Sequence, residues 1–171
     1  MERPRIKIRL TTFDYIVEIF SILSVLGSIV LYVIYRINPP EVVPMHYNIH
    51  GEVDGYGGSK AVLIILPIIN ILTYAVLTIL NKYPHIFNFP TAVTEENAFF
   101  LYKSSTRMVR QLKLLIALLI AFLVWYLEKG ITLQEHTFYD ILLWLFYASV
   151  IICPIFLIVK INKKMKKQHN K

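Results

Sequence analysis

Cysteine and charge are both scarce in this chain. Cys153 is the single cysteine among 171 residues, which excludes an internal disulfide and a thiol-based metal centre. Charged residues make up 17% of the chain, whereas hydrophobic residues make up 56%. So few charges cannot cover a soluble fold of this length, and the composition therefore indicates an integral membrane protein. A serine-hydrolase nucleophile motif, a phosphate-binding loop and a helical His-Glu-x-x-His pattern are all lacking, so no catalytic residue is assigned.

Four apolar runs predict transmembrane helices. Crossing a hydrocarbon core of about 30 Å takes roughly 20 helical residues. The runs predict spans at 15–35, 61–80, 108–127 and 141–159, in a single membrane domain of residues 1–171. The uncharged part of the third run, 114–127, would reach only about 21 Å, so this span requires Arg110 and Lys113 to extend to the lipid headgroups. The expected fold is an all-α four-transmembrane-helix bundle.

The basic residues are unevenly distributed. All but three of the 18 lie on the N-terminal arm, in segment 82–113 or in the tail from Lys160. Positive residues mark the cytoplasmic side, so we expect both termini to be cytoplasmic and the loop at 36–60 to be extracellular. Anionic lipid headgroups at the inner face account for the net charge of +7 without a nucleic-acid partner.

Two acids lie near the start of the first span. Asp14 and Glu18 share a helix face because they are four residues apart, and Thr11 or Thr12 is suited to cap the helix. We expect the acids to be solvated at the membrane interface, or to pair with Arg9 or an inner-loop cation. A proton relay is the alternative interpretation.

The second span contains a proline and an amide within its apolar run. Pro67 removes a helical donor and Asn70 needs a partner in hydrocarbon, so both are expected to face the bundle. We expect Asn70 to lock helices together, and the alternative is that it lines a cavity. Ser59 is the expected cap of this helix.

A long helix is predicted to lead into the third span. It begins at Thr94, which two glutamates follow, and it ends at Gly130. Lys103, Arg107 and Arg110 form a basic stripe along it, which we expect to contact lipid headgroups.

The remaining polar chemistry is concentrated in the loop at 36–60. Residues 43–50 alternate between apolar and polar, which predicts an extended strand with His46, Asn48 and His50 on one face. The glycine-rich segment 50–59 is expected to fold back on it. The loop is therefore predicted to form a small extracellular cap or hairpin.

His46, His50, Glu52 and Asp54 are the candidate metal ligands of this loop. In a strand the two histidines would lie about 13 Å apart, which is too far for both to bind one ion. A metal site would need a sharp turn, or one histidine with Glu52 or Asp54. We expect instead a structural network in which the Asp54 carboxylate accepts backbone N–H bonds. Partner recognition is the first alternative, metal binding or catalysis is the second, and no cofactor is expected.

The loop also contains a recognisable spacing, Pro44-x-His46-x-Asn48-x-x-Gly51-x-x-Asp54, closed by Ser59 and Lys60. It resembles the uncharacterised bacterial membrane domain found at the N-terminus of Sdp-type (SdpI-like) immunity proteins. Residues 83–90 and 94–97, with Tyr102 and Arg107, extend this resemblance over about 12–113.

The resemblance implies a protein of the bacterial cytoplasmic membrane with unassigned molecular function. Immunity against a secreted peptide toxin belongs to relatives with a further membrane region, and its signature is not seen after Leu112. Two functions are therefore carried forward. The first is immunity-like recognition of an extracellular peptide or membrane partner. The second is a small transporter component or membrane enzyme that uses Glu18, Asn70 and the outer loop, although transport sites generally need several polar groups near the midplane.

Overall fold

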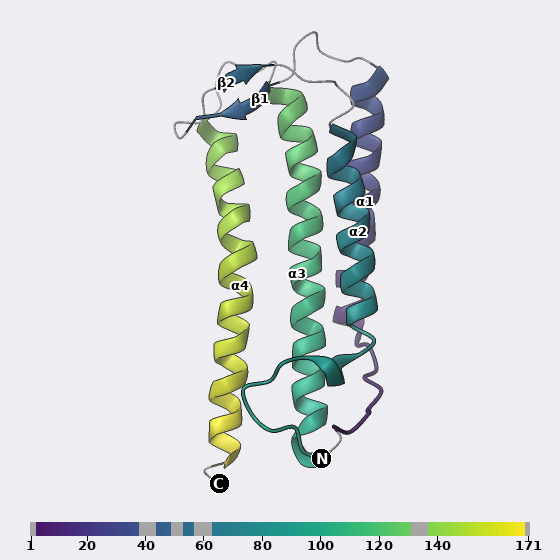
Figure 1. The fold of residues 1–171 in the computed structure, drawn as a ribbon, viewed down its shortest axis with the longest axis vertical. Helices are drawn as coiled ribbons and strands as arrows, with labels where there is room; N and C mark the ends of the chain where they lie inside the picture. The colour runs from purple at the N-terminus through teal and green to yellow at the C-terminus, as the bar shows by residue number, and fades with distance from the viewer. Residues whose placement is uncertain (1–2, 38–43, 49–52, 57–62, 131–136, 170–171) are drawn as a thin grey trace.

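Four helices and one β-hairpin make up the described part of the chain. The computed structural model describes residues 3–37, 44–48, 53–56, 63–130 and 137–169. Its elements are α1 (Thr12–Ile37), β1 (Pro44–Tyr47), β2 (Val53–Tyr56), α2 (Ile65–Leu80), the 3-10 turn η2 (Pro84–Ile86), α3 (Glu95–Gly130) and α4 (Thr137–His169). The helices lie side by side, with the hairpin at one end of the bundle and both termini at the other (Figure 1).

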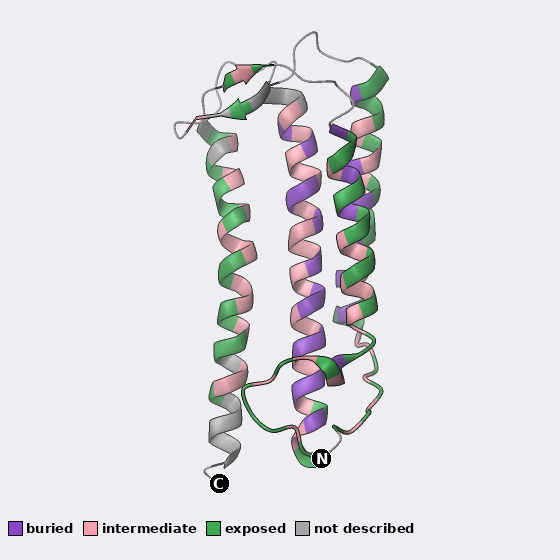
Figure 2. Ribbon diagram, viewed as in Figure 1, coloured by how far each residue is buried: buried purple, intermediate pink, exposed green. Residues whose placement is uncertain are grey.

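α3 is the central helix of the bundle. It packs against α1, α2 and α4, and α1 also packs against α2. Burial follows this arrangement, because buried positions recur along α3 whereas none of the described side chains of α4 is buried (Figure 2).

The polarity of α1 is the reverse of that in a soluble protein. Its buried face includes Asp14, Ser21, Ser24 and Ser28. Large apolar side chains such as Leu23 are exposed instead. Water would oppose this arrangement, but the hydrocarbon of a bilayer favours it.

Helix length supports the same conclusion. Within the described residues, three helical segments are long and apolar enough to cross a membrane: Thr12–Ile37, Glu95–Leu127 and Ile141–Lys163. α2 is apolar but shorter, with 16 residues, or about 24 Å. The chain is therefore a membrane protein with a helical fold, and the number of helices agrees with the four predicted.

Local capping determines where the two best-defined helices begin. The Thr11 N–H donates to Asp14 Oδ2 at 2.8 Å, and the Asp14 N–H points back to Thr11 Oγ1 at 3.4 Å. At α3, the Thr94 N–H donates to the Asn97 side-chain oxygen at 2.9 Å. The two bonds at α1 are reciprocal, and the bonds at both helices satisfy N–H groups that the start of a helix leaves without an intrahelical partner. The predicted starts of both helices, and the uninterrupted course of α3 to Gly130, are confirmed.

The second helix begins later than predicted. α2 starts at Ile65, and its N-cap residue, Ile64, makes no side-chain capping bond. The α-helix therefore begins after the predicted start of the span at residue 61, because a short 3-10 turn at 63–64 precedes it, and residues 61 and 62 lie outside the described residues. Ser59, the expected cap, lies outside the described residues.

The N-terminal arm packs along the end of the bundle where the termini lie. Ile6 and Ile8 contact a buried cluster of Ala98, Leu101 and Tyr102 on α3. The Tyr102 hydroxyl also donates to the Pro4 carbonyl oxygen at 3.0 Å. Along the arm, the basic side chains at 3, 5, 7 and 9 are exposed while the residues between them are partly buried. The arm is thus an amphipathic extended segment attached to α3.

Candidate functional site

The outer hairpin brings two residues of the predicted motif together. β1 and β2 pair antiparallel, with His46 opposite Gly55. His46 Nδ1 lies 2.5 Å from Asp54 Oδ1, and the two side chains are 73% and 44% exposed. Among the described residues, the partner of the Asp54 carboxylate is the His46 imidazole. The backbone N–H bonds expected from the rest of the loop stay a prediction, because 49–52 and 57–60 lie outside the described residues. The pair is open to solvent and to a partner.

Gly55 allows the two strands to approach closely at this point. A Cβ built on Gly55 would lie 2.9 Å from the Cβ of His46, closer than real Cβ contacts. Only glycine therefore fits opposite His46 without a shift of the backbone. Sequence reasoning counted Gly55 only among the turn glycines, because its importance depends on the pairing of the strands.

The other motif residues are only partly placed by the structure. Pro44 lies in β1, and Asn48 directly follows β1 and is partly buried. Gly51 and Lys60 lie outside the described residues, as do the metal candidates His50 and Glu52. Within the described residues, no group of three or more His, Cys, Asp or Glu side chains is suited to hold a metal ion.

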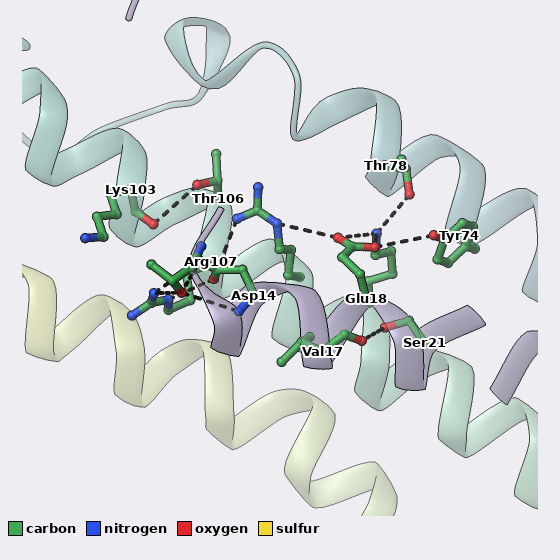
Figure 3. A network of polar contacts seen from close by, with 12 residues as sticks. Asp14, Val17, Glu18, Ser21, Tyr74, Thr78, Lys103, Thr106 and Arg107 are labelled. Atoms are coloured by element: carbon green, nitrogen blue, oxygen red, sulfur yellow. Dashed lines mark hydrogen bonds and ion pairs between the residues drawn. The ribbon is translucent and has the colours of Figure 1, made fainter. Parts of the chain in front are cut away.

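A second polar cluster lies inside the bundle, near the start of α1 (Figure 3). The Asp14 carboxylate accepts two bonds from the Arg107 guanidinium, at 3.0 Å from Nε and 3.2 Å from Nη2. Arg107 Nη2 also donates to Thr11 Oγ1 at 2.9 Å. The cap of α1 and a cation of α3 therefore form one unit, which fixes the start of α1 against α3.

One turn further along α1, Glu18 connects three helices. Lys113 Nζ on α3 donates to its two carboxylate oxygens at 2.9 and 2.7 Å, and to Thr78 Oγ1 on α2 at 2.9 Å. Tyr74 on α2 donates its hydroxyl to Glu18 at 3.3 Å. The Lys113 side chain is only 1% exposed. Glu18 is thus held by both neighbouring helices.

Arg110 lies between the two acids. Its Nη1 is 4.0 Å from Asp14 Oδ1, and its Nε is 3.5 Å from Glu18 Oε1. The cluster therefore contains two carboxylates and three cations: Asp14, Glu18, Arg107, Arg110 and Lys113. Here we call it the buried charge network.

This network corrects two predictions. Arg110 and Lys113 do not extend to the headgroups, because Arg110 is 8% exposed and both side chains turn toward acids of α1. Headgroup contact is likewise the wrong interpretation of the basic stripe at Arg110, whereas Arg107 pairs with Asp14 and its side chain remains 35% exposed. Lys103 Nζ lies 5.5 Å from the centroid of the Phe99 ring. The expected pairing of Asp14 with a cation is confirmed, and the cation is Arg107 rather than Arg9.

Asn70 links the middle of the bundle. Its Nδ2 donates to Ser28 Oγ on α1 at 3.1 Å and to the Ala117 carbonyl oxygen on α3 at 3.4 Å. Pro67 and Asn70 both face the bundle, as predicted. The serines of α1 turn to their own helix, as when Ser21 Oγ donates to the Val17 carbonyl oxygen. These contacts agree with an interhelical lock.

Sequence reasoning missed Lys113 as a member of the buried charge network, and it missed Tyr74 and Thr78 as hydrogen-bond partners of the network on α2. The sequence nevertheless contained a signal. Arg107, Arg110 and Lys113 recur every three residues in one predicted helix, and Asp14 and Glu18 are four residues apart in another. Such complementary spacings on two helices indicate that the helices pack side by side.

No curated protein and no solved structure matches the chain. A family model described as "Domain of unknown function (DUF1648)" matches residues 22–71. The match begins in α1, includes the hairpin with His46 and Asp54, and ends just beyond Asn70 in α2. It does not extend to segment 83–113, which the sequence resemblance also covered. Residues 22–71 are therefore similar to an uncharacterised domain of unknown function, and the hairpin lies within the matched region.

Proposed function

We propose that this chain is a recognition protein of the bacterial cytoplasmic membrane. Its hairpin would face the outside of the cell and bind an extracellular peptide or another membrane protein through His46 and Asp54. The observation that carries this proposal is the exposed His46–Asp54 pair on a hairpin held at one end of the bundle.

The orientation follows from charge. The N-terminal arm and the α4 tail, which carry many of the basic residues, lie at the end opposite the hairpin. With that end cytoplasmic, both termini are inside and the hairpin is outside. An imidazole next to a carboxylate then offers hydrogen-bond donors and acceptors, together with charge that depends on protonation, to a polar partner.

The resemblance to Sdp-type immunity proteins suggests the partner class. A secreted peptide toxin would meet the outer hairpin before it reached the bilayer. Immunity-like recognition is accordingly the specific form of this proposal.

The contacts inside the bundle favour recognition over transport. Asn70 is 1% exposed and bonded to both neighbouring helices. Each cation of the buried charge network lies within 4.0 Å of a carboxylate. Groups held in this way stabilise helix packing, whereas a transport site must exchange partners with its cargo.

Site-specific photo-cross-linking in native membranes tests the proposal. A photoreactive residue at position 56, which lies on the same hairpin and leaves His46 and Asp54 intact, is expected to capture a defined peptide or membrane protein, which mass spectrometry would identify. The matched control places the same residue at Ile86, which is exposed at the opposite end of the bundle. His46→Ala is expected to weaken capture by a photoreactive residue at exposed Tyr56 on the same hairpin.

The recognition proposal would be abandoned on two joint findings. One is that a photoreactive residue at position 56 captures only lipid, as the one at position 86 does. The other is that His46→Ala leaves sensitivity to every tested peptide toxin unchanged.

A further inference from the structure

A pocket of about 450 Å³ lies at the end of the bundle that contains the termini. Its walls come from the end of α2, from segment 86–90, from α3 and from α4. Most wall residues are aliphatic or aromatic, as shown by Phe87 and Phe89 in the segment, Val109 on α3 and Ile158 on α4. This volume is typical of sites that bind small apolar molecules.

One wall of the pocket is held in place by a cation of the N-terminal arm. Arg3 Nη1 donates to the carbonyl oxygens of His85 at 2.9 Å and Phe87 at 2.6 Å. Its guanidinium carbon also lies 5.9 Å from the centroid of the Phe89 ring. The pocket is therefore a built feature of the fold, supported by contacts between segments more than 80 residues apart in the chain.

The surroundings of the pocket combine lipid-facing and cationic surfaces. On α4, the apolar side chains Ile155 and Val159 are exposed next to the wall residue Ile158. Lys82 lies two residues beyond the wall residue Leu80, and Lys163 directly follows the wall residue Asn162. Both lysines are exposed.

We propose that this pocket binds one acyl chain of an anionic phospholipid from the adjacent leaflet. The acyl chain would lie against Phe87, Phe89 and Val109, where it supplies van der Waals contacts that the apolar walls otherwise lack. Lys82 and Lys163 would meet the headgroup phosphate, because cations near a membrane surface attract anionic lipids. This inference does not depend on the function proposed for the hairpin.

Lipid retention by the full-length protein tests the inference. The protein is reconstituted in vesicles of phosphatidylglycerol and phosphatidylethanolamine and extracted in mild detergent, and native mass spectrometry identifies the lipid that stays bound. One phosphatidylglycerol per chain is expected, in preference to phosphatidylethanolamine. Ser105→Phe fills the pocket from α3 and should lower retention roughly tenfold. The control, Ile152→Phe on the exposed face of α4, should leave retention unchanged.

A second variant keeps the test decisive if Ser105→Phe fails to fold. Lys82→Gln combined with Lys163→Gln changes only exposed side chains, and it should abolish the preference for phosphatidylglycerol while retention of one phospholipid continues. The inference is overturned if the wild-type protein retains no phospholipid or retains a peptide instead. It is also overturned if folded Ser105→Phe retains as much lipid as the control, or if the double variant keeps the full preference.

Discussion

Gly55 and His46 illustrate how one small residue determines the position of a larger one. The strands meet where Gly55 faces His46, and the missing side chain of Gly55 makes room for the Cβ of His46. Asp54, the neighbour of Gly55, is thereby brought to the imidazole. The exposed pair therefore depends on a residue that takes no part in its hydrogen bond.

Gly55→Ala tests this dependence. The added methyl group would overlap the Cβ of His46, so the strands must separate locally, at an expected free-energy cost of about 1–3 kcal/mol. Hydrogen exchange at the backbone amides of 45–47 and 53–56 should become faster, because the hairpin opens more often.

Gly27→Ala is the matched control, since a Cβ at Gly27 in α1 would meet nothing within 4 Å. Its hairpin exchange should equal that of the wild type. If Gly55→Ala and the wild type exchange their hairpin amide hydrogens at the same rate, the close approach of the strands does not determine the stability of the hairpin.

Among the helices, α1 and α3 run in the same direction and are joined by charge as well as by packing. Asp14 pairs with Arg107, and Glu18 pairs with Lys113. Burying charged groups is unfavourable unless each has a partner, so this network strongly opposes any shift of one helix along the other. We infer that it fixes the register between α1 and α3.

Lys113→Met is expected to destabilise the bundle. Glu18 would lose its closest cation while Arg110 remains 3.5 Å away, so the expected loss is near the lower end of the range for a broken buried pair, about 3 kcal/mol. Thermal unfolding in micelles, followed by the circular dichroism of the helices, measures this loss.

Two further variants separate charge pairing from packing. Lys103→Met removes a cation that lies over the Phe99 ring and should have little effect. Adding Glu18→Gln to Lys113→Met should restore part of the stability, because the unpaired carboxylate is removed. If Lys113→Met and Lys103→Met unfold at the same temperature, the network does not hold the helices together.

Local signals in the sequence predicted some parts of these elements and missed others. The starts of α1 and α3 were predictable because each capping contact joins residues close in sequence, Thr11 with Asp14 at α1 and Thr94 with Asn97 at α3. The pairing of Glu18 with Lys113 was not, since it depends on how two helices are offset in space. Alternation predicted a strand at His46, but the position of Gly55 opposite it depends on a pairing whose register is irregular.

For the bundle as a complete unit, the expected orientation leads to a labelling prediction. In a Cys153→Ala background, Tyr56→Cys on the hairpin should react with a membrane-impermeant maleimide in intact cells, because Tyr56 is exposed and the proposed orientation places the hairpin outside the cell. Lys7→Cys on the exposed side of the arm should react only after the cells are permeabilised. Labelling of Lys7→Cys alone in intact cells would reverse the proposed orientation.

The short second helix has a consequence for the surrounding lipid. α2 contributes 16 helical residues, about 24 Å against a hydrocarbon core of about 30 Å. α1, with 26 residues, is long enough to cross the full thickness. The two helices are neighbours, so the bilayer next to α2 is expected to be compressed on one side of the protein only. Such one-sided thinning would enrich shorter-chain lipids beside α2. The protein itself would be expected to prefer thin regions of the membrane.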